Sequence, residues 1–477
     1  MTKGFVGRTV ELASLGKRLK RVTSSGTGVA VAIRGRRQVG KSRLAQEFCD
    51  RAGVPYLFFS ATKGASPVES VATFLADLSE SSLPTDRELI PRQARGWADA
   101  FRILTSVLPT TPAIVVLDEV PWLAEQDKGF DGALQTAWDR LFAGRAVLLL
   151  LLGSDIHMME RLTAYDRPFF GRADNMVLGP LTPAEVGHAL GLDPVDAIEA
   201  HLVCGGIPGI LRSWPHATPA LPFMRTECSD PAAPLFSVPE STLLGEFPSP
   251  DQARRVLEAV GSGERTHANI AATAGSRQGA IPSGSLSPLL RRLVEEKHVL
   301  AVDEPLSTSP GKPALYRVAD SNLRLYLAML RSAQELARRG RQEAAFDLVR
   351  RRWSSWRGRA VEPLVRQSLE LAAPALPWPE VNAVGGWWNR QFNPEIDLVG
   401  ADQAPIARRI QFAGSIKWLE THFDDRDLAD LRRTAAQVPG FTYGKTGLVV
   451  VTRTGTAPNL DLGKADLVWH PDDILSA

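Results

Sequence analysis

The residues best suited to chemistry lie in one short stretch near the N-terminus, which reads Gly-Arg-Arg-Gln-Val-Gly-Lys-Ser at residues 35–42. The spacing fits G-x-x-x-x-G-K-[ST], a loop whose backbone amides surround phosphate oxygens. Glycine permits close backbone approach, Lys41 would reach the β- and γ-phosphates, and the Ser42 hydroxyl would ligate Mg²⁺. We therefore predict a site for the phosphates of a nucleotide, formed by Gly35, Arg36, Arg37, Gln38, Val39, Gly40, Lys41, Ser42 and Arg43.

The elements on either side of this loop must position it. Residues 29–33 are an apolar run that predicts a buried strand, and residues 42–48 predict the first turns of a helix. The motif requires a strand that feeds the loop and a helix whose N-terminus points at the anion. A chance glycine-rich turn is the alternative, and the order of strand, loop and helix disfavours it.

Two acids end the next clear strand pattern. Residues 113–117 are apolar and lead into Asp118 and Glu119, about 80 residues after the loop. In a nucleotide site of this type, Asp118 would hold Mg²⁺ through water and Glu119 would orient or activate the attacking water. Two acids at this point also suit an ordinary helix N-terminus. Because they follow a complete phosphate loop, we favour the catalytic interpretation.

Two further side chains are candidates for the same site. The apolar run at residues 146–152 predicts a buried strand that delivers Ser154, where a polar group would sense the γ-phosphate. Arg172, on a later loop, would stabilise charge during phosphoryl transfer, in cis or in trans, although a plain surface arginine is an equal alternative. Strands that alternate with helices predict an α/β fold with a parallel sheet, followed by a small helical lid, so that the first domain spans residues 1–215.

Composition limits the class of protein. The chain has 477 residues and a net charge of +2, which suggests roughly three domains and means that any surface for nucleic acid must be local. Its three cysteines are widely spaced and form neither a metal motif nor a disulfide framework, which favours a reducing, cytoplasmic setting. The longest aliphatic run is shorter than the ~20 residues needed to span a bilayer, so we expect no membrane association.

The middle of the chain predicts a different kind of domain. Residues 216–250 are rich in Pro and Ser and predict a linker with one short helix at most. Residues 251–320 then predict three helices and a β-hairpin, which is a winged-helix pattern. The third helix, residues 286–297, would enter a major groove if this domain reads DNA. Winged helices also bind proteins, and both interpretations stay open. Residues 321–352 predict a helical connector.

A basic segment overlaps this connector. Residues 331–367 contain ten arginines and four acids, a local charge of +6, with Trp353 and Trp356 between them. A basic helical surface that carries aromatic side chains suits a phosphate backbone. The alternative is a solvated helix face whose tryptophans belong to the core.

Several motifs of the first domain together resemble a known family. Phe5-Val6-Gly7-Arg8, followed by Glu11, resembles the hhGRExE motif of STAND and Orc/Cdc6-like AAA+ ATPases, although Thr9 stands where that motif usually has Glu. Together with the phosphate loop, the two acids, Gly153-Ser154, Phe170-Gly171-Arg172 and Gly205-Gly206-Ile207-Pro208, it resembles the archaeal-type ATPase branch. The resemblance implies that Arg8 and Glu11 lie near the nucleotide. Without it, the two would form an ordinary solvated ion pair.

The C-terminal part, residues 353–477, reads as helix, three strands, helix, strand. This order resembles the PD-(D/E)xK restriction-endonuclease-like fold that accompanies the archaeal-type ATPase. On this resemblance Asp397 is the metal-binding acid, Glu362 the auxiliary acid and Lys417 the lysine. Ser415 stands where the family has its second metal-binding carboxylate, and a hydroxyl cannot replace that ligand. We therefore expect a nuclease-like fold that is inactive.

These features predict an ATP-binding and ATP-hydrolysing switch with ATP and Mg²⁺ as ligands. Its nucleotide state would control the binding of double-stranded DNA. One alternative is an ATP-gated DNA nuclease. Another is an ATPase that remodels a protein partner without DNA. The sequence leaves the protein partner and the oligomeric state open.

Overall fold

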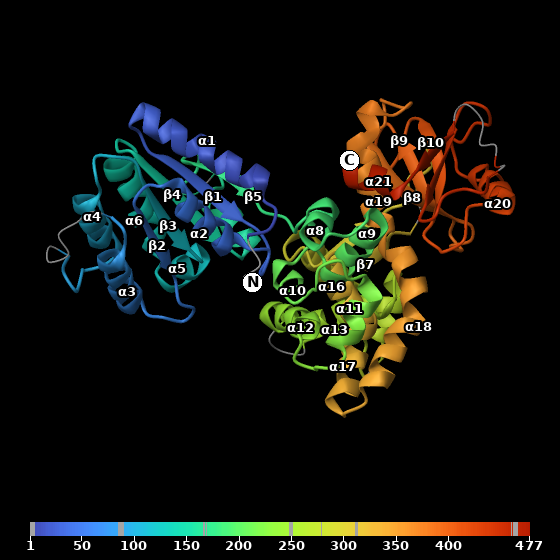
Figure 1. The fold of residues 1–477 in the computed structure, drawn as a ribbon, viewed down its shortest axis with the longest axis horizontal. Coiled ribbons are helices and arrows are strands. Elements are labelled where there is room, and N and C mark those ends of the chain that lie inside the picture. Colours follow the sequence, from blue (N-terminus) through green and yellow to red (C-terminus); the bar gives the residue numbers. More distant parts are fainter. Residues whose placement is uncertain are drawn as a thin grey trace. The chain divides into compact units, whose positions relative to one another are not determined.

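The apolar runs of the first domain form a five-stranded parallel sheet in the computed structural model of the chain (Figure 1). Its strands are β1 (Val29–Arg34), β2 (Tyr56–Ser60), β3 (Ala113–Asp118), β4 (Val147–Gly153) and β5 (Ala173–Val177). The spatial order is β2-β3-β4-β1-β5, so β4 lies between the strand that feeds the phosphate loop and the strand that carries the acids. The α/β prediction with a parallel sheet is confirmed.

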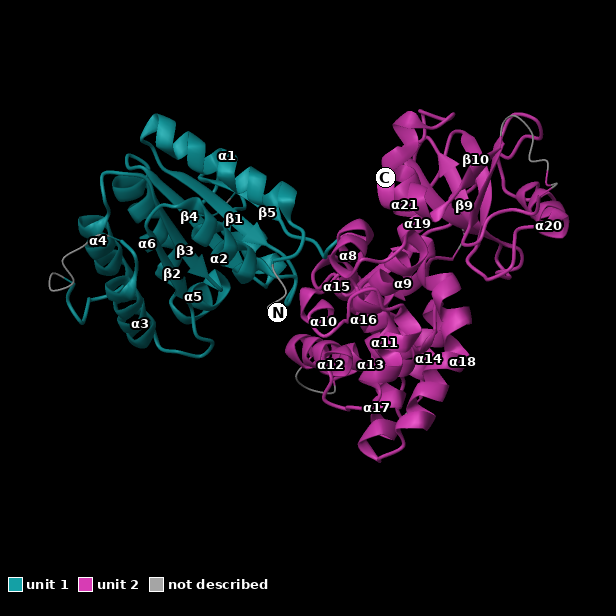
Figure 2. Cartoon of the chain, viewed as in Figure 1, with its two compact units in different colours: residues 1–181 teal, residues 182–477 magenta. Residues whose placement is uncertain are grey.

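The structure describes residues 5–83, 90–165, 167, 169–247, 251–277, 279–310, 313–458, 460 and 466–477. Its contacts divide the chain into two units, residues 1–181 and 182–477 (Figure 2). Pro168, four residues before Arg172, and Ala465 lie outside the described residues.

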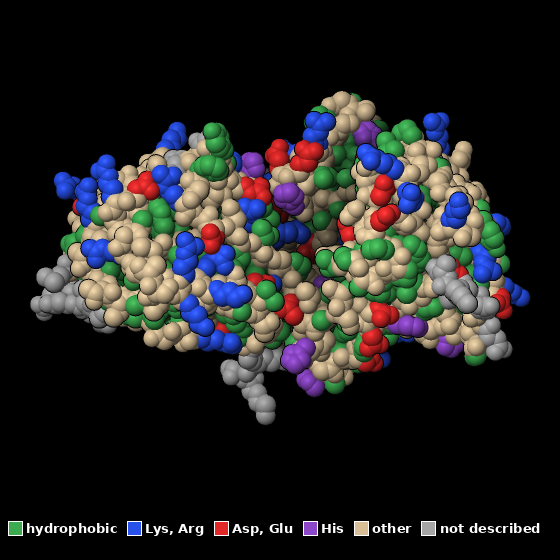
Figure 3. Space-filling model, turned by 90° about the horizontal axis from the view of Figure 1, so that it is seen from above, with side chains coloured by type: hydrophobic (Ala, Val, Ile, Leu, Met, Phe, Trp, Pro, Cys, Tyr) green, Lys and Arg blue, Asp and Glu red, His purple; other side chains and the backbone are tan. Residues whose placement is uncertain are grey.

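Charged side chains are spread over the surface. On the face shown in Figure 3, basic side chains are scattered among acidic and uncharged ones and form no continuous patch. This agrees with the small net charge of the chain, +2. Among the described residues, no helix is both long and apolar enough to cross a membrane.

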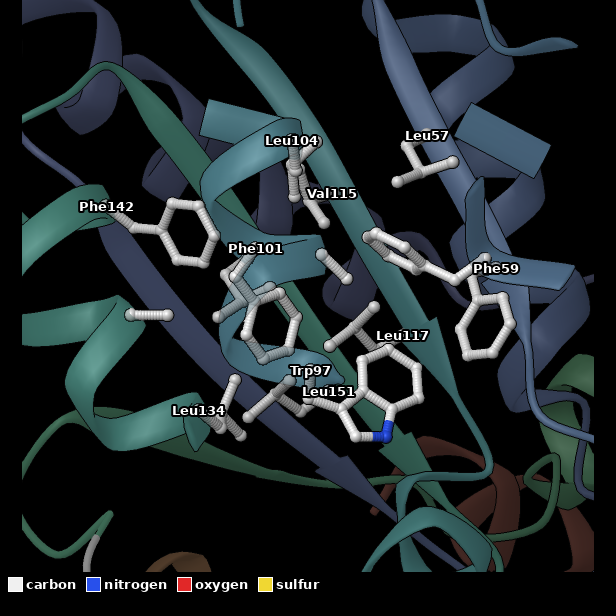
Figure 4. Close-up of a cluster of buried hydrophobic side chains, with 14 of the residues drawn as sticks. Leu57, Phe59, Trp97, Phe101, Leu104, Val115, Leu117, Leu134, Phe142 and Leu151 are labelled. Carbon is white, nitrogen blue, oxygen red and sulfur yellow. The ribbon is translucent and has the colours of Figure 1, made fainter. Parts of the chain in front are cut away.

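Helices cover both faces of the parallel sheet in unit 1. They are α1 (Thr9–Ser25), α2 (Lys41–Ala52), α3 (Pro67–Glu80), α4 (Trp97–Val107), α5 (Val120–Gln126), α6 (Phe130–Ala137), which continues as a π-helical turn (Trp138–Phe142), and α7 (Ile156–Leu162). Alternate residues of β3 and β4 enter two separate cores, one with α1 and α2 and one with α3, α4 and α6. In the second core, Phe59, Trp97 and Phe101 surround Leu117 (Figure 4). This burial on both sides explains why the strand sequences are continuously apolar.

Unit 2 begins with helices that we had predicted as a lid on the first domain. They are α8 (Pro183–Leu190), α9 (Pro194–Cys204) and α10 (Pro208–Leu211), and α8 begins with a capping box formed by Thr182 and Glu185. Gly205 and Gly206 turn the chain between α9 and α10 with φ of 61° and 66°. By its contacts this helical group belongs to unit 2 and not to the unit that holds the parallel sheet.

The predicted linker is wrong, because the described part of residues 216–250 contains two helices. They are α11 (Ala220–Glu227) and α12 (Pro234–Glu246). Their apolar side chains Phe223, Leu235 and Phe236 are fully buried. Pro234 occupies the first turn of α12, where proline is tolerated because the missing N–H would have had no helical partner. Pro239 lies inside the same helix, so the prolines of this segment do not mark an unstructured connection.

The next segment has the predicted order of three helices and a hairpin. The elements are α13 (Gln252–Ser262), α14 (His267–Thr273), α15 (Ser283–Glu295), β6 (Leu300–Asp303) and β7 (Leu315–Val318), with β6 and β7 antiparallel. The helix that would read DNA, α15, starts earlier than predicted and buries Leu286, Leu290 and Leu293.

A helical stack follows, formed by α16 (Ser321–Leu325), a π-helical turn (Tyr326–Leu330), α17 (Arg331–Arg338), α18 (Gln342–Ala360) and α19 (Glu362–Ala372). Trp353 is 2% exposed and stacks on Trp356 with ring centroids 5.6 Å apart. Acids from other elements pair with arginines of this segment, for example Glu240 with Arg338 at 3.0 Å. The position of Trp353 favours the core alternative for the tryptophans.

The C-terminal part contains a mixed five-stranded sheet. Its strands are β8 (Ala383–Trp388), β9 (Glu395–Ala401), β10 (Ile410–Lys417), β11 (Gly447–Thr452) and β12 (Leu467–Trp469), in the order β12-β11-β10-β9-β8. A short 3-10 helix (Ala373–Ala375) precedes the sheet, α20 (Asp425–Ala435) lies between β10 and β11, and α21 (Pro471–Ser476) ends the chain. The strands β8, β9 and β10 are antiparallel, whereas β10, β11 and β12 are parallel. This agrees with the predicted order of elements.

A buried group of charges links α9 to the C-terminal sheet within unit 2. The Glu199 carboxylate accepts hydrogen bonds from Arg357 at 2.9 Å and from Arg453 at 2.8 Å. Arg357 also pairs with Glu420 at 2.9 Å. The side chains of Glu199 and Arg357 are 6% and 3% exposed, but that of Glu420 is 74% exposed. Because burial removes these charges from water, Glu199 and the two arginines need one another as partners to offset the cost of desolvation.

Candidate functional site

The phosphate loop lies between the end of β1 and the start of α2. Gln38 and Gly40 have φ of 66° and 94°, so the loop uses left-handed backbone geometry just before the helix begins. A Cβ on Gly35 would lie 2.3 Å from the carbonyl oxygen of Leu178, so this position requires glycine. The amides at the start of α2 form the positive end of the helix dipole, which suits an anion.

Lys41 lies inside this loop. Lys41 is 5% exposed, and its Nζ donates to the carbonyl oxygens of Gly35 at 2.7 Å and Arg36 at 3.0 Å. Burial lowers the pKa of the Lys41 ammonium to about 8, while the carboxylates of Glu119 and Asp118 raise this pKa in part. The lysine is therefore held in the loop, close to both acids.

Asp118 and Glu119 lie at the carboxyl edge of the same sheet. Asp118 is 3% exposed, accepts a hydrogen bond from the Glu119 backbone N–H at 2.9 Å and one from the Ser60 hydroxyl at 3.5 Å. Glu119 has a φ of 54°, a left-handed conformation that is unfavourable for a residue with a Cβ. Such backbone strain is concentrated at functional sites. The sequence analysis missed Ser60, although a serine at the end of β2 was a visible signal.

Ser154 follows β4 and contacts the second acid. Its hydroxyl donates to the Glu119 carboxylate at 2.9 Å and its backbone N–H donates to the same oxygen at 3.3 Å. The strand register pairs Arg34 with Gly153 and Leu117 with Leu151, which brings the loop, Ser154 and the acids to one edge. The role of Ser154 in sensing a phosphate stays a prediction. Its observed contact fixes the side chain of Glu119.

Arg8 contacts the loop. It bonds to backbone carbonyls as well as to Glu11, which an ordinary solvated Arg–Glu ion pair would not do. Its guanidinium donates to the carbonyl oxygens of Val39 at 3.0 Å and Gly179 at 2.7 Å and pairs with Glu11 at 3.2 Å. The other charged loop residue at the helix start, Arg43, is exposed and pairs with Glu47 at 2.9 Å. The resemblance implied that Arg8 and Glu11 lie near the nucleotide, and contact of Arg8 with the loop is consistent with this.

Arg172 forms a two-pronged ion pair with Asp139. Its Nε and one terminal nitrogen donate to the two carboxylate oxygens at 2.8 and 2.9 Å. The sequence analysis did not identify Asp139, because nothing in the local pattern links two residues so far apart in the chain. A role of Arg172 in phosphoryl transfer stays a prediction.

The residues of this edge fit a nucleotide with its metal. The loop offers backbone donors and one ammonium group, and the Ser42 hydroxyl and the Asp118 carboxylate are the oxygen ligands that Mg²⁺ prefers. Such a site needs few protein ligands, because phosphates and water supply the rest. Among the described residues, no group of three His, Cys, Asp or Glu could hold a metal without such additional ligands.

The Lys41 ammonium gives the site a specific dependence on pH. Because its pKa is about 8, raising the pH from 7 to 9 removes most of its positive charge. We expect the affinity for ATP to fall by about tenfold over this range, since the charged form is the one that binds phosphate. Titration of a fluorescent ATP analogue at each pH measures this. In Lys41→Arg, whose guanidinium stays charged, the fall should be absent; equal pH profiles for the two proteins would contradict the assignment.

The predicted nuclease residues come together in unit 2. A cavity of about 530 Å³ is lined by residues of α18, α19, β9, β10 and α20, and these include Glu362, Asp397, Ser415 and Lys417. The sequence therefore identified a true spatial cluster. It missed Asp427 of α20, which lines the same cavity.

The acids of this cavity have partners within the chain. Ser415 donates its hydroxyl hydrogen bond to Asp397 at 3.1 Å, and the backbone N–H of Ile416 donates to the same oxygen at 2.8 Å. Glu362 pairs with Arg366 at 3.2 Å. Lys417 forms a close ion pair with Asp427. One oxygen of Asp397 and one of Glu362 are thus bonded to groups of the chain itself.

Burial changes the titration of two of the cavity acids. Burial raises the pKa of Glu362 to about 7, against the opposing effect of the Arg366 guanidinium, and the nearby Asp397 and Glu395 carboxylates raise this pKa further. Burial also raises the pKa of Asp397, against the hydrogen bond from Ile416. The loss of nuclease activity that Ser415 implies stays a prediction.

Comparisons with known proteins identify the nucleotide part. Residues 4–140 match the AAA ATPase domain family. The matched residues include the phosphate loop, Asp118 and Glu119. Residues 326–428 match a second family, described as archaeal and bacterial proteins of unknown function. No curated protein matches the chain.

Solved structures with a similar arrangement include three archaeal proteins. The Walker-type ATPase of Pyrococcus abyssi is 20% identical with a TM-score of 0.49, covering 68% of this chain and 96% of that one. The Orc2 protein of Aeropyrum pernix is 13% identical with a TM-score of 0.46, covering 72% and 96%. The Orc1 protein of the same organism, solved in complex with DNA, is 16% identical with a TM-score of 0.34, covering 70% and 92%.

Proposed function

We propose that the chain is a Mg²⁺-dependent ATPase whose nucleotide state controls the binding of duplex DNA by unit 2. The observation that carries the ATPase part is the convergence of the phosphate loop, Asp118, Glu119 and Ser154 on one sheet edge, with Ser154 bonded to Glu119 at 2.9 Å. The match of this region to the AAA ATPase family supports it. In this proposal, a few side chains at the same sheet edge bind the phosphates, hold Mg²⁺ and orient the attacking water.

Each of these side chains has a defined task in the proposal. Lys41 neutralises the transferred phosphate, and Ser42 and Asp118 would hold Mg²⁺, which supplies further positive charge to the phosphates. Glu119 accepts a hydrogen bond from the attacking water and orients it. Ser154 keeps the Glu119 carboxylate in one position, since its hydroxyl and its backbone N–H both donate to the same oxygen.

The DNA part of the proposal rests on the helices and hairpin of residues 251–318. The helix α15 buries its leucines and exposes Arg291 and Arg292. Neither arginine forms an ion pair with any residue that the structure describes, so both are available for phosphate. The exposed Glu295 and Glu296 limit this surface to a small area. A small basic area on a third helix fits contact with a DNA backbone.

Fluorescence anisotropy of a labelled DNA duplex tests this switch. We expect binding that differs between ATP, ADP and no nucleotide and weakens steeply when the salt concentration is raised. Replacing Arg291 and Arg292 by Ala should reduce the slope of log affinity against log salt by about 2, the value for two lost phosphate contacts. The matched control is Arg95→Ala, a 91% exposed arginine of unit 1, which should change nothing.

Other results would redirect the proposal. Equal DNA affinity with ATP, ADP and no nucleotide would show that DNA binding does not depend on the nucleotide state of unit 1. No binding in any state would favour the third hypothesis, in which the hairpin domain docks a protein. The nuclease hypothesis is the weaker one, because Ser415 stands where the nuclease-like fold has its second metal-binding carboxylate.

A further inference from the structure

Arg8 is a buried cation that connects two separate segments of unit 1. Its side chain is 5% exposed, and a single terminal nitrogen donates to the carbonyl oxygens of both Val39 and Gly179. The backbone of Arg8 has a φ of 63°, so an unfavourable conformation is maintained to hold the side chain there. Val39 belongs to the phosphate loop, whereas Gly179 lies 140 residues later in the chain.

The segment that contains Gly179 also touches the loop directly. The Leu178 backbone N–H donates to the Arg34 carbonyl at 2.7 Å, and the Leu178 carbonyl lies where a Cβ on Gly35 would be. Two residues after Gly179, unit 1 ends at Leu181 and the chain continues into unit 2. The first residues of the loop, Arg8 and the exit of unit 1 are therefore in mutual contact.

We propose that Arg8 is a positioning residue that transmits the state of the phosphate loop to residues 178–181, the exit from unit 1. The proposal rests on ATP binding by this loop. The Lys41 ammonium donates to the carbonyls of Gly35 and Arg36, and phosphate competes for the same ammonium. The loop backbone must then adjust. Because one guanidinium nitrogen holds both Val39 and Gly179, a displaced Val39 carbonyl changes the bond to Gly179.

The chemistry of arginine explains why this residue type is needed. A guanidinium is planar and presents several donors in a fixed fork, so it can hold Glu11 and two carbonyls at once. The ammonium of lysine is a compact charge without this fork. Arg8→Lys therefore keeps the positive charge but loses the rigid connection. Arg21→Lys is the matched control, because it makes the same substitution at an exposed arginine of α1.

Hydrogen exchange of the full chain, read by mass spectrometry with and without saturating ATP, tests the proposal. The saturating concentration is first measured for each protein. In the wild type, ATP should change the exchange rate of amides at residues 178–181 by about fivefold or more, the lower end of usual coupling between sites. Arg8→Lys should lose this response, and Arg21→Lys should keep it.

The possible results separate this proposal from the proposed function. If the wild type does not bind ATP, both fail. If it binds ATP and the exchange at residues 178–181 does not change, the connection alone is overturned. It is also overturned if Arg8→Lys responds like the wild type, or if that variant melts at a lower temperature but keeps its response to ATP, since Arg8 would then be structural.

Discussion

Lys41→Ala should weaken ATP binding by about 100-fold or more and abolish phosphate release in the presence of Mg²⁺. The substitution removes the ammonium that the loop encloses, and with it hydrogen bonds to charged phosphate that are each worth about 1.5–3 kcal/mol. Two such bonds correspond to roughly a 100-fold loss or more at about 1.4 kcal/mol for each factor of ten. Calorimetric titration with ATP measures the affinity directly.

The control for this variant is Lys20→Ala, which removes an exposed lysine from α1 of the same unit. It keeps the loop intact and should bind ATP like the wild type. Affinity of Lys41→Ala within threefold of the control would contradict the assignment of the loop. A folded variant is required, and an unchanged circular dichroism spectrum establishes this.

Glu199→Ala should lower the free energy of unfolding of unit 2 by about 3–5 kcal/mol, the usual cost of leaving a buried charge without its partner. Both arginines that donate to Glu199 would lose this carboxylate, and Arg357 is 3% exposed. Urea unfolding of the full chain measures the effect. Because a ligand stabilises the unit that binds it, added ATP should shift only the transition of unit 1 and so identify the other one.

Glu420→Ala provides a matched comparison for Glu199→Ala. Glu420 pairs with the same Arg357 at the same distance, 2.9 Å, but its side chain is 74% exposed. An exposed ion pair contributes about 0–1 kcal/mol, so this variant should unfold nearly like the wild type. Equal losses in the free energy of unfolding of unit 2 for the two substitutions would show that the burial of Glu199 does not determine this stability.

The parts of the fold that the sequence predicted correctly depend on local patterns. The phosphate loop and the strands that end in Asp118 and Ser154 are continuous runs of residues whose types fix their conformation. The sheet then brings them together, because the carboxyl ends of parallel strands share one edge. Asp397 and Ser415 were expected together only from the resemblance to the nuclease-like fold. They meet because β9 and β10 are antiparallel, so that the start of β9 lies beside the end of β10.

The parts that could not be predicted are contacts between distant residues with no periodic signal. Arg8 with Gly179, Arg172 with Asp139, and Lys417 with Asp427 each join segments whose packing the sequence does not specify. The linker prediction failed for another reason. Prolines were counted as breaks, although the segment also carries large apolar residues such as Phe223 and Phe236, which are fully buried in α11 and α12.

The position of α9 has a consequence for how such a chain is assembled in evolution. Its Ile198 and Leu202 share a buried cluster with Phe412 and Val449 of the C-terminal sheet, next to the charges around Glu199. A gene fusion that joined a new ATPase at residue 215 would remove this helix and expose that cluster to water. A recombination point at residue 181 leaves every one of these contacts intact. The ATPase could therefore be inherited or exchanged as a module that ends before α8.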